Sequence, residues 1–389
     1  MSSAEKDWRP RVKIAFLTNM VPPYHKPVLK LLTQRYGGLR IFISTAMEAN
    51  RPWKAEWNGL DVVVQKGLAI KSGWRHPKGF SEAVTVHIPL DTISQLARYK
   101  PDVVMSGEMG MRTLLALLYR KFAGSCKLLI WSEVTKTTEQ GRGVLRGLLR
   151  KRLARRVDGF LALGAGGADY IRSLGVAEDK IFRLAYTTDI ERFSCLSATR
   201  TGEAARRLLY AGQLVQRKGL MPFLSTLSRW AAAQPEHRIE FMIAGNGPLE
   251  AELRALPVPD NVKLIFRGAV QYEDLPELYG QAGIFVMPTL ADTWGVVVNE
   301  ALASAVPVMG SLASQAVEEM IEDGKTGWTF RPQVEDEVYS AIDRALLCPA
   351  EELQNMRGRA RQRALQISPE YVAGLIDKAL AFCAAEALA

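Results

Sequence analysis

Two acidic side chains eight positions apart form the strongest chemical pattern in the chain. Asp292 and Glu300 flank Gly295 in the stretch from Pro288 to Pro307. An apolar run precedes this stretch, so we expect a buried strand, a loop and then a helix that begins near Gly295. Unpaired N–H groups at a helix start suit a diphosphate, and carboxylates accept hydrogen bonds from vicinal hydroxyls. Because the same acids also suit a helix-start charge and a solvated side chain, the pattern alone predicts only a polar ligand.

A basic pair precedes these acids by about 75 residues. Arg217 and Lys218 stand before Gly219, after an apolar run that ends at Gly212. Arginine offers a planar fork of donors and lysine a point charge, so the pair could neutralise a diphosphate leaving group. An exposed basic turn is the other interpretation of such a pair.

Two more strand-like runs end in glycine. Gly245 lies in Ala-Gly-Asn-Gly-Pro, and Arg267 and Gly268 end the next apolar run. Glycine allows a phosphate or a base to approach the backbone closely, although a tight strand–helix turn would explain Gly245 equally well.

Together these segments resemble the signature of family-4 retaining glycosyltransferases. Its usual form is Glu-Gly-Phe-Gly and then a second Glu, whereas this chain has Asp292-Thr-Trp-Gly and then Glu300. The resemblance implies that Glu300 holds the ribose of a nucleotide-diphosphate sugar. It also implies that Asp292 contacts the transferred sugar. The backbone of Trp294, Gly295 and Val296 would then hold the sugar and the β-phosphate.

The resemblance extends to the reaction. It implies hexosyl transfer with retention of configuration, with Arg217, Lys218, Asp292 and Glu300 as catalytic residues. The donor-binding set would add Gly212, Gly245, Arg267, Gly268, Trp294, Gly295 and Val296. We expect no cofactor besides the nucleotide-diphosphate sugar, which is a substrate, and no required metal. The chain has only 4 His residues, which argues against a His-based metal site.

The first half of the chain offers candidates for the acceptor side. Tyr24, His25 and Lys26 follow the first strand-like run in a Pro-Pro-Tyr segment that a subset of this family carries. Packing of Tyr24 and His25 against the first helix is the alternative. Glu108 and Glu133 end two later apolar runs and could orient an acceptor hydroxyl.

Strand-like runs such as 39–43 and helical patterns such as 26–35 alternate through both halves, which predicts two doubly wound parallel sheets. The fold class is therefore α/β, with two Rossmann-like domains, and the resemblance implies that they face a central cleft (GT-B). We place an acceptor-binding domain at 1–190 and a nucleotide-sugar-binding domain at 191–368. A C-terminal helix at 369–389 is expected to cross back to the first domain.

Composition narrows the class of protein. Hydrophobic residues make up 48% and charged residues 23% of the chain, which are ordinary globular values. The chain has no apolar run of about 18 residues, so we expect no membrane span. Residues 1–11 are too polar for a secretory signal. The cysteines are scattered, which favours reduced thiols in a cytoplasmic protein. They are Cys126, Cys195, Cys348 and Cys383.

Charge is distributed unevenly. Residues 1–190 carry 31 Lys and Arg against 16 Asp and Glu, whereas residues 191–389 carry 19 against 25. The first half should therefore meet an anionic partner. The segment 142–156 is a basic amphipathic pattern with Val144, Leu145, Leu148, Leu149 and Leu153 on one face. It predicts either a helix that binds an anionic membrane surface or one that packs this stripe on the sheet.

These observations predict a glycosyltransferase whose acceptor is a glycan or a lipid-linked glycan of cell-surface polysaccharide synthesis. It would be cytoplasmic, or peripheral at the inner face of the cell membrane. The alternatives are a nucleotide-sugar epimerase and a catalytically silent protein that binds nucleotide sugar or glycan. No nucleic-acid recognition motif is present, so nucleic acid is not an expected partner.

Overall fold

The computed structural model describes residues 12–388 except 49, 50, 52, 78, 125 and 196–199. The segment 1–11, which we expect not to be a secretory signal, lies outside the described residues. Contacts divide the chain into two units: unit 1 contains residues up to Tyr186 together with those from Pro369, and unit 2 contains Thr187–Ser368. The sequence placed this boundary at 190.

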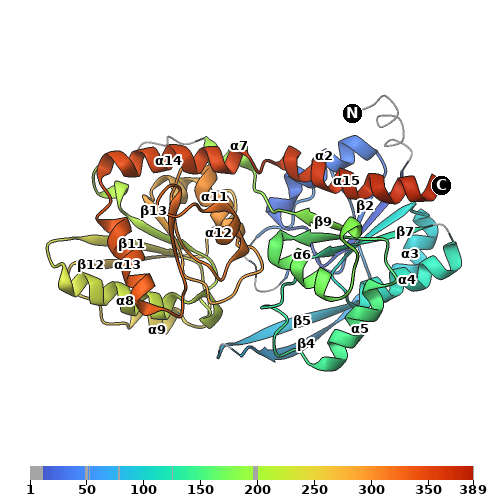
Figure 1. Ribbon diagram of the computed structural model, residues 1–389, viewed down its shortest axis with the longest axis horizontal. Coiled ribbons are helices and arrows are strands. Elements are labelled where there is room, and N and C mark those ends of the chain that lie inside the picture. Colours follow the sequence, from blue (N-terminus) through green and yellow to red (C-terminus); the bar gives the residue numbers. More distant parts are fainter. Residues whose placement is uncertain are drawn as a thin grey trace. The chain divides into compact units, whose positions relative to one another are not determined.

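Unit 1 is built on a parallel sheet of seven strands (Figure 1). In spatial order these are β3 Asp61–Val64, β2 Leu39–Ile43, β1 Ile14–Thr18, β6 Val103–Gly107, β7 Lys127–Ser132, β8 Gly159–Leu163 and β9 Ile181–Leu184. The middle strands are almost fully buried, as expected for parallel strands covered on both faces. The doubly wound α/β fold predicted for this half is confirmed.

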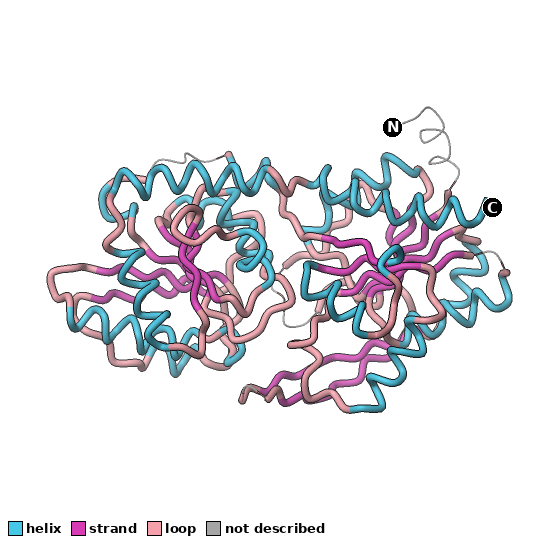
Figure 2. The backbone as a smooth tube through the Cα atoms, viewed as in Figure 1, coloured by secondary structure: helices cyan, strands magenta, loops and turns pink. Residues whose placement is uncertain are grey.

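Helices cover both faces of this sheet (Figure 2). They are α2 Lys26–Tyr36, α3 Thr92–Tyr99, α4 Met111–Ala123, α5 Val144–Ala154, α6 Gly164–Ser173 and α15 Pro369–Leu388. The last of these, α15, packs on α2 and β9. Its Asp377 carboxylate accepts hydrogen bonds from Arg35 at 2.6 Å and from Tyr36 at 2.9 Å. The C-terminal helix therefore completes the fold of unit 1.

An antiparallel hairpin stands apart from the seven-stranded sheet. Its strands are β4 Gly67–Arg75 and β5 Ser81–Pro89, which pair along their whole length. The sequence analysis did not predict this hairpin, because its residues do not alternate strictly between apolar and polar. Near its tip, Trp74 donates a hydrogen bond to the Gln140 carbonyl at 3.2 Å, which ties the hairpin to the loop before α5.

Unit 2 contains a parallel sheet of six strands. In spatial order these are β12 Val262–Gly268, β11 Ile239–Ala244, β10 Leu208–Ala211, β13 Ile284–Met287, β14 Val308–Ser311 and β15 Gly327–Phe330. Its helices are α7 Ile190–Ser194, α8 Leu220–Ala233, α9 Glu250–Arg254, α10 Leu275–Gly280, α11 Val296–Ala303, α12 Gln315–Met320, α13 Glu335–Leu346 and α14 Ala350–Leu365. One apolar core joins the sheet to α8, α13 and α14, with Trp230 fully buried in it. The second α/β unit predicted from the sequence is thus confirmed.

Helix α5 tests one of the two roles predicted for segment 142–156, the packing of its apolar stripe on the sheet. Leu153 is buried, but Val144, Leu145 and Leu148 are 81%, 82% and 58% exposed. The prediction that one apolar stripe packs on the sheet is wrong, because the inward face carries Arg150. This arginine is 2% exposed, pairs with Glu139 at 2.7 Å and donates to the Tyr170 hydroxyl. Most of the stripe faces solvent.

No helix in the described part of the chain is long and apolar enough to cross a membrane.

Candidate functional site

Asp292 and the basic pair predicted from the sequence meet in unit 2. The short 3₁₀ turn Gln216–Lys218 follows β10 and brings both cations to the loop after β13. Lys218 Nζ lies 2.5 Å from Asp292 Oδ2, and Arg217 Nη1 lies 3.6 Å from the same oxygen. Arg217 also donates to the Ala291 carbonyl at 2.9 Å. Two cations on one carboxylate leave a net positive site, which favours a phosphate.

The loop between β13 and α11 is held tightly around Gly295. This glycine has φ 102°, and a Cβ there would lie 2.4 Å from Met287 Cε. The Trp294 carbonyl accepts from Ser314 Oγ and from the Ala316 amide. Trp294 itself is 1% exposed, and its indole donates to Asn299 Oδ1 at 2.8 Å. The tryptophan side chain therefore braces the loop, as expected if this segment binds ligand through its backbone.

Glu300 lies on α11 with its side chain buried. It is 4% exposed and accepts a hydrogen bond from the Tyr279 hydroxyl at 3.0 Å. Burial raises the pKa of Glu300 to about 7. The hydrogen-bond partner of Glu300 is Tyr279, whereas Asp292 forms ion pairs with Arg217 and Lys218. The two acids thus occupy different surroundings on either side of the α11 start.

The predicted glycines form a row at the carboxyl ends of neighbouring strands. The Gly212 amide donates to the Ala244 carbonyl at 2.9 Å, and the Gly245 amide donates to the Gly268 carbonyl at 2.6 Å. Gly245 has φ 135°, and a Cβ there would lie 1.8 Å from the Gly212 oxygen. Only glycine fits at 245, since both the dihedral and the space exclude a side chain.

Arg267 lies at the same edge and is exposed. Its guanidinium donates to Gln281 Oε1 at 3.0 Å, so it contacts the α10 end rather than the Asp292 cluster. The structure therefore does not bring this predicted donor residue to the Asp292 cluster.

A second cluster of acids lies in unit 1, where Glu108 and Glu133 follow β6 and β7. The Glu133 amide donates to Glu108 Oε1 at 2.9 Å. Burial raises the pKa of both carboxyls, that of Glu108 to about 7, and the neighbouring charge of Glu133 adds to the shift in Glu108. Glu108 also has φ 66°, which is rare for a residue with a side chain. Strained backbone and perturbed acids together are typical of functional sites.

Aromatic side chains surround this acid pair. Tyr186 donates to Glu133 Oε1 and accepts from the Trp131 indole at 3.1 Å. The His25 ring lies 4.7 Å from the Tyr186 ring and 5.4 Å from the Trp131 ring. Burial lowers the pKa of His25 to about 3, so its imidazole is neutral near pH 7. The structure therefore places His25 against Tyr186 and Trp131, the aromatic side chains beside Glu133, and not only against the first helix.

The other residues of the Pro-Pro-Tyr segment face different neighbours. The Tyr24 ring lies 5.9 Å from the Tyr186 ring, at the edge of the aromatic group. Lys26 lies 3.7 Å from Glu56 and is thus turned toward another acid. Of the three predicted residues, His25 lies deepest in the cluster.

A family model described as Glycosyl transferases group 1 matches residues 205–347. This part of the chain is a group 1 glycosyltransferase domain. The domain includes Arg217, Lys218, Asp292 and Glu300, and it lies wholly within unit 2.

Curated relatives are similar to the chain over part of its length. The chain is 28% identical over 262 residues to a sulfoquinovosyl transferase of Arabidopsis thaliana, which covers 63% of the chain and 50% of the relative. It is 25% identical over 222 residues to an α-(1→4)-mannosyltransferase of Mycolicibacterium hassiacum, covering 56% and 52%. The chain thus spans about half the length of these two relatives.

Solved structures share the two-unit fold. Anabaena Alr3699/HepE, solved in complex with UDP, superposes with a TM-score of 0.71 over 95% of this chain and 99% of its own, at 14% identity. The lipopolysaccharide outer core galactosyltransferase WaaB superposes with a TM-score of 0.67 over 95% and 99%, also at 14% identity. At such identity the likeness shows the fold alone.

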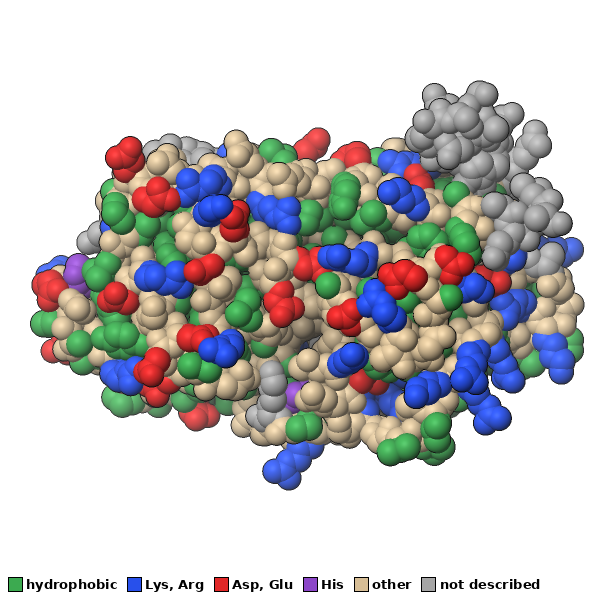
Figure 3. Space-filling view, in the orientation of Figure 1, with side chains coloured by type: hydrophobic (Ala, Val, Ile, Leu, Met, Phe, Trp, Pro, Cys, Tyr) green, Lys and Arg blue, Asp and Glu red, His purple; other side chains and the backbone are tan. Residues whose placement is uncertain are grey.

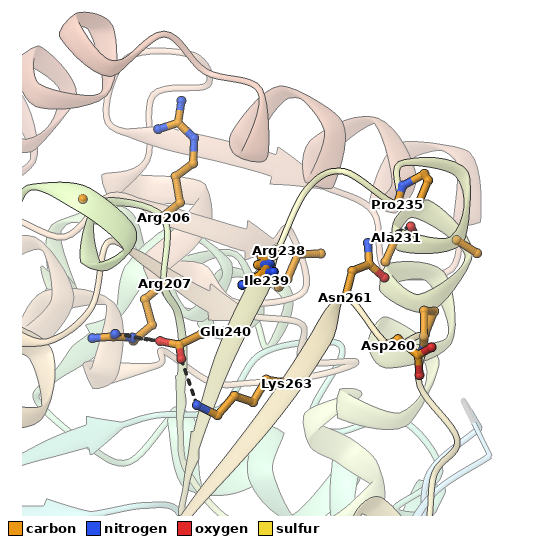
Figure 4. A pocket seen from close by; sticks show the side chains of 13 residues that line it. Arg206, Arg207, Ala231, Pro235, Arg238, Ile239, Glu240, Asp260, Asn261 and Lys263 are labelled. Atoms are coloured by element: carbon orange, nitrogen blue, oxygen red, sulfur yellow. Dashed lines mark hydrogen bonds and ion pairs between the residues drawn. The ribbon is translucent and has the colours of Figure 1, made fainter.

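The group 1 domain also contains a cavity of about 1160 Å³ away from the candidate residues. Its lining includes Arg207, Glu240 and Lys263, at or near the amino ends of β10, β11 and β12 (Figure 4). Glu240 lies between the two cations and pairs with both, at 2.6 and 3.2 Å. Two cations on one acid thus occur here as well. Ligands of open parallel α/β sheets bind beyond the carboxyl ends of the strands, so we place the candidate donor site at that opposite edge.

Three residues that contact the candidate site residues or lie beside them were not predicted from the sequence. Tyr279 holds Glu300, Tyr186 holds Glu133, and Arg112 donates to the Asn19 side chain beside the acid pair. Each comes from an element whose pattern gives no sign of the partner it reaches. The position of Asn19 beside Glu108 could have been predicted from strand order alone. Asn19 follows β1 and Glu108 follows β6, and these two strands pair.

No group of three or more His, Cys, Asp or Glu side chains in the described residues could hold a metal ion. Metal-independent transfer remains a prediction.

Proposed function

We propose that the protein is a retaining glycosyltransferase that moves a hexosyl unit from a nucleotide-diphosphate sugar to a hydroxyl of a glycan or lipid-linked acceptor. The donor binds in unit 2 and the acceptor in unit 1. The observation that carries the proposal is the pairing of Arg217 and Lys218 on Asp292 inside the group 1 domain. Preorganised cations at this point would stabilise the departing nucleoside diphosphate as its charge develops.

The acid pair of unit 1 supports the acceptor half of the proposal. A hydroxyl that attacks a sugar loses its proton, and a carboxylate with a pKa near the working pH is suited to receive it. Glu108, whose pKa is about 7, has one carboxyl oxygen buried without a hydrogen-bond partner among the described residues. We assign Glu108 and Glu133 to orienting the acceptor hydroxyl.

The exposed face of α5 supports a lipid-linked acceptor of cell-surface polysaccharide synthesis. Hydrophobic side chains lie next to basic ones over this part of the surface (Figure 3). An apolar stripe flanked by Lys and Arg favours the interface of an anionic membrane. The protein would then act as a peripheral enzyme at the inner face of the cell membrane.

The reaction is tested by measuring nucleoside diphosphate release from UDP-glucose and from GDP-mannose. Octyl glucoside, octyl galactoside and octyl mannoside serve as acceptor probes. We expect release with at least one donor that depends on an acceptor and produces an octyl disaccharide. Acceptor-independent release, a donor converted to its epimer, or no turnover with any pair would contradict the proposal.

Two variants with a matched control connect turnover to the site. Lys218→Ala and Glu300→Ala should each lose most transfer activity. As the control, Lys325→Ala removes an exposed lysine of unit 2 that forms an ion pair with Glu322. This variant should keep its transfer activity. Equal turnover in all three variants would contradict the site assignment.

A further inference from the structure

A small cavity in unit 1 lies where the hairpin leaves the seven-stranded sheet. It has a volume of about 130 Å³. Its walls are the residues that follow β2, the residue that follows β3, and the base of the β4–β5 hairpin. Four polar side chains line it: Ser44, Thr45, Gln65 and His87.

The Thr45 hydroxyl donates to the Met47 carbonyl at 3.0 Å, whereas the other three side chains each have a buried polar atom without a hydrogen-bond partner among the described residues. These atoms are Ser44 Oγ, Gln65 Oε1 and His87 Nε2. Gln65 is only 5% exposed, and its amide nitrogen donates to Thr92 Oγ1 at 2.9 Å, which holds the side chain in place. Leaving a buried polar atom unpaired costs about 1–3 kcal/mol, so these three atoms need hydrogen bonds from water or from a guest that replaces it.

The cavity continues the polar edge that carries the acid pair. Along the strand order β3, β2, β1, β6 and β7, the strand ends are followed by Gln65, Ser44, Asn19, Glu108 and Glu133. The Ser44 amide donates to the Asn19 carbonyl at 2.9 Å. The charges of Glu48 and Arg112 both act on His87, although burial is the main cause that lowers its pKa. The proposed acceptor site and the cavity are thus neighbours along one edge.

The lining favours a neutral guest with hydroxyl groups. None of the nine lining residues is Lys or Arg, which argues against a phosphate. A hydroxyl both donates and accepts, so a polyhydroxyl guest can satisfy a serine, an amide oxygen and an imidazole nitrogen together. The volume corresponds to about four water molecules, which matches the hydroxyl-bearing part of one sugar ring.

We infer that this cavity is a subsite for the glycan part of the acceptor, in which Ser44, Gln65 and His87 bind sugar hydroxyls. The inference rests on the proposed function, because it extends the acceptor side of the same edge. It assigns a role in acceptor choice to the hairpin, which supplies one wall.

Saturation-transfer NMR on the full chain tests the subsite, with methyl glucoside, methyl galactoside and methyl mannoside as probes. Ala69 pairs with His87 and shares its face, whereas the next residue, Ile70, points to the other face. Ala69 and Ile70 are both exposed, so Ala69→Trp should plug the cavity while Ile70→Trp serves as the matched control. Ser44→Ala combined with Gln65→Met removes three polar atoms with little change of volume, including the Gln65 amide nitrogen that donates to Thr92.

We expect saturation transfer to at least one glycoside in the wild type and in Ile70→Trp. Ala69→Trp should abolish it, and the Ser44→Ala, Gln65→Met variant should weaken binding at least about fivefold. No transfer in the wild type, or equal transfer in Ala69→Trp, would overturn the subsite. A UDP or GDP thermal shift measured on the same samples reports on unit 2, so failure of the subsite is distinguishable from failure of the donor site.

Discussion

Asp292 is the residue on which the electrostatics of the candidate donor site depend. It pairs with Lys218 at 2.5 Å and lies 3.6 Å from Arg217, so it competes with an incoming diphosphate for both cations. The resemblance to family-4 enzymes gives it a second role, in contact with the transferred sugar. These two roles affect binding and turnover in opposite directions.

Replacing Asp292 by Asn should separate the two roles. Removal of one negative charge ends the competition between Asp292 and the diphosphate, so the affinity for UDP or GDP should rise about two- to fivefold, as expected for a partly exposed ion pair. The transfer rate should fall, since the contact with the sugar is altered. Isothermal titration and turnover measured together check this, and an unchanged nucleotide affinity would contradict it.

Glu300 makes stability depend on pH. Burial raises its pKa from 4.5 to about 7, so the folded state keeps a proton that the unfolded state releases. The stabilisation is present below pH 4.5 and is lost as the pH rises to about 7, by an amount on the order of 3 kcal/mol.

The Glu300→Gln variant has no carboxyl at this position, so it should not lose this stabilisation as the pH rises. Between pH 5 and pH 8 its free energy of unfolding should rise relative to that of the wild type. Urea denaturation of both proteins at the two pH values isolates Glu300 from Glu108 and Glu133, which are common to both proteins. A difference that stays constant with pH would mean that Glu300 is ionised throughout.

At the scale of elements, α5 is the helix whose sequence and environment disagree most. Its leucines are exposed, whereas its Arg150 is buried against Glu139. Because α5 packs on the rest of unit 1 through Arg150, its apolar stripe stays exposed and can contact another partner. We propose that this partner is a membrane.

Leu145→Ser combined with Leu148→Ser should weaken binding to vesicles that contain anionic lipid. Burying one leucine is worth about 1.5–3 kcal/mol, so the loss should be at least about tenfold. The matched control, Leu347→Ser with Leu365→Ser, removes two exposed leucines of unit 2. Co-sedimentation at low salt compares them. Equal binding of both variants, or no binding of the wild type, would contradict a membrane role for α5.

The elements that the sequence predicts well are those with one dominant period. The predicted strand 39–43 has the bounds of β2, and the predicted helix 26–35 differs from α2 by one residue. The hairpin 67–89 was missed because an exposed two-stranded ribbon needs no apolar face. The contacts of Arg150 and Tyr186 depend on tertiary packing between distant segments, which no local pattern records.

At the scale of the whole molecule, two α/β units divide the proposed tasks. The group 1 domain in unit 2 contains the cations for a diphosphate, and unit 1 contains the acids and the small cavity for an acceptor. The excess of positive charge in residues 1–190 belongs almost entirely to unit 1. We therefore propose that this unit faces the anionic partner, whether a membrane surface or a diphosphate-linked glycan.

Nucleotide binding by Lys218→Ala tests the central claim most directly. A ligand present at 100 times its Kd stabilises the folded state by about 2.7 kcal/mol. UDP or GDP should therefore raise the Tm of the wild type and of Lys325→Ala by several degrees, and that of Lys218→Ala by much less. If neither nucleotide shifts the wild type, or if both shift Lys218→Ala as much as the wild type, the donor site does not lie at Arg217, Lys218 and Asp292.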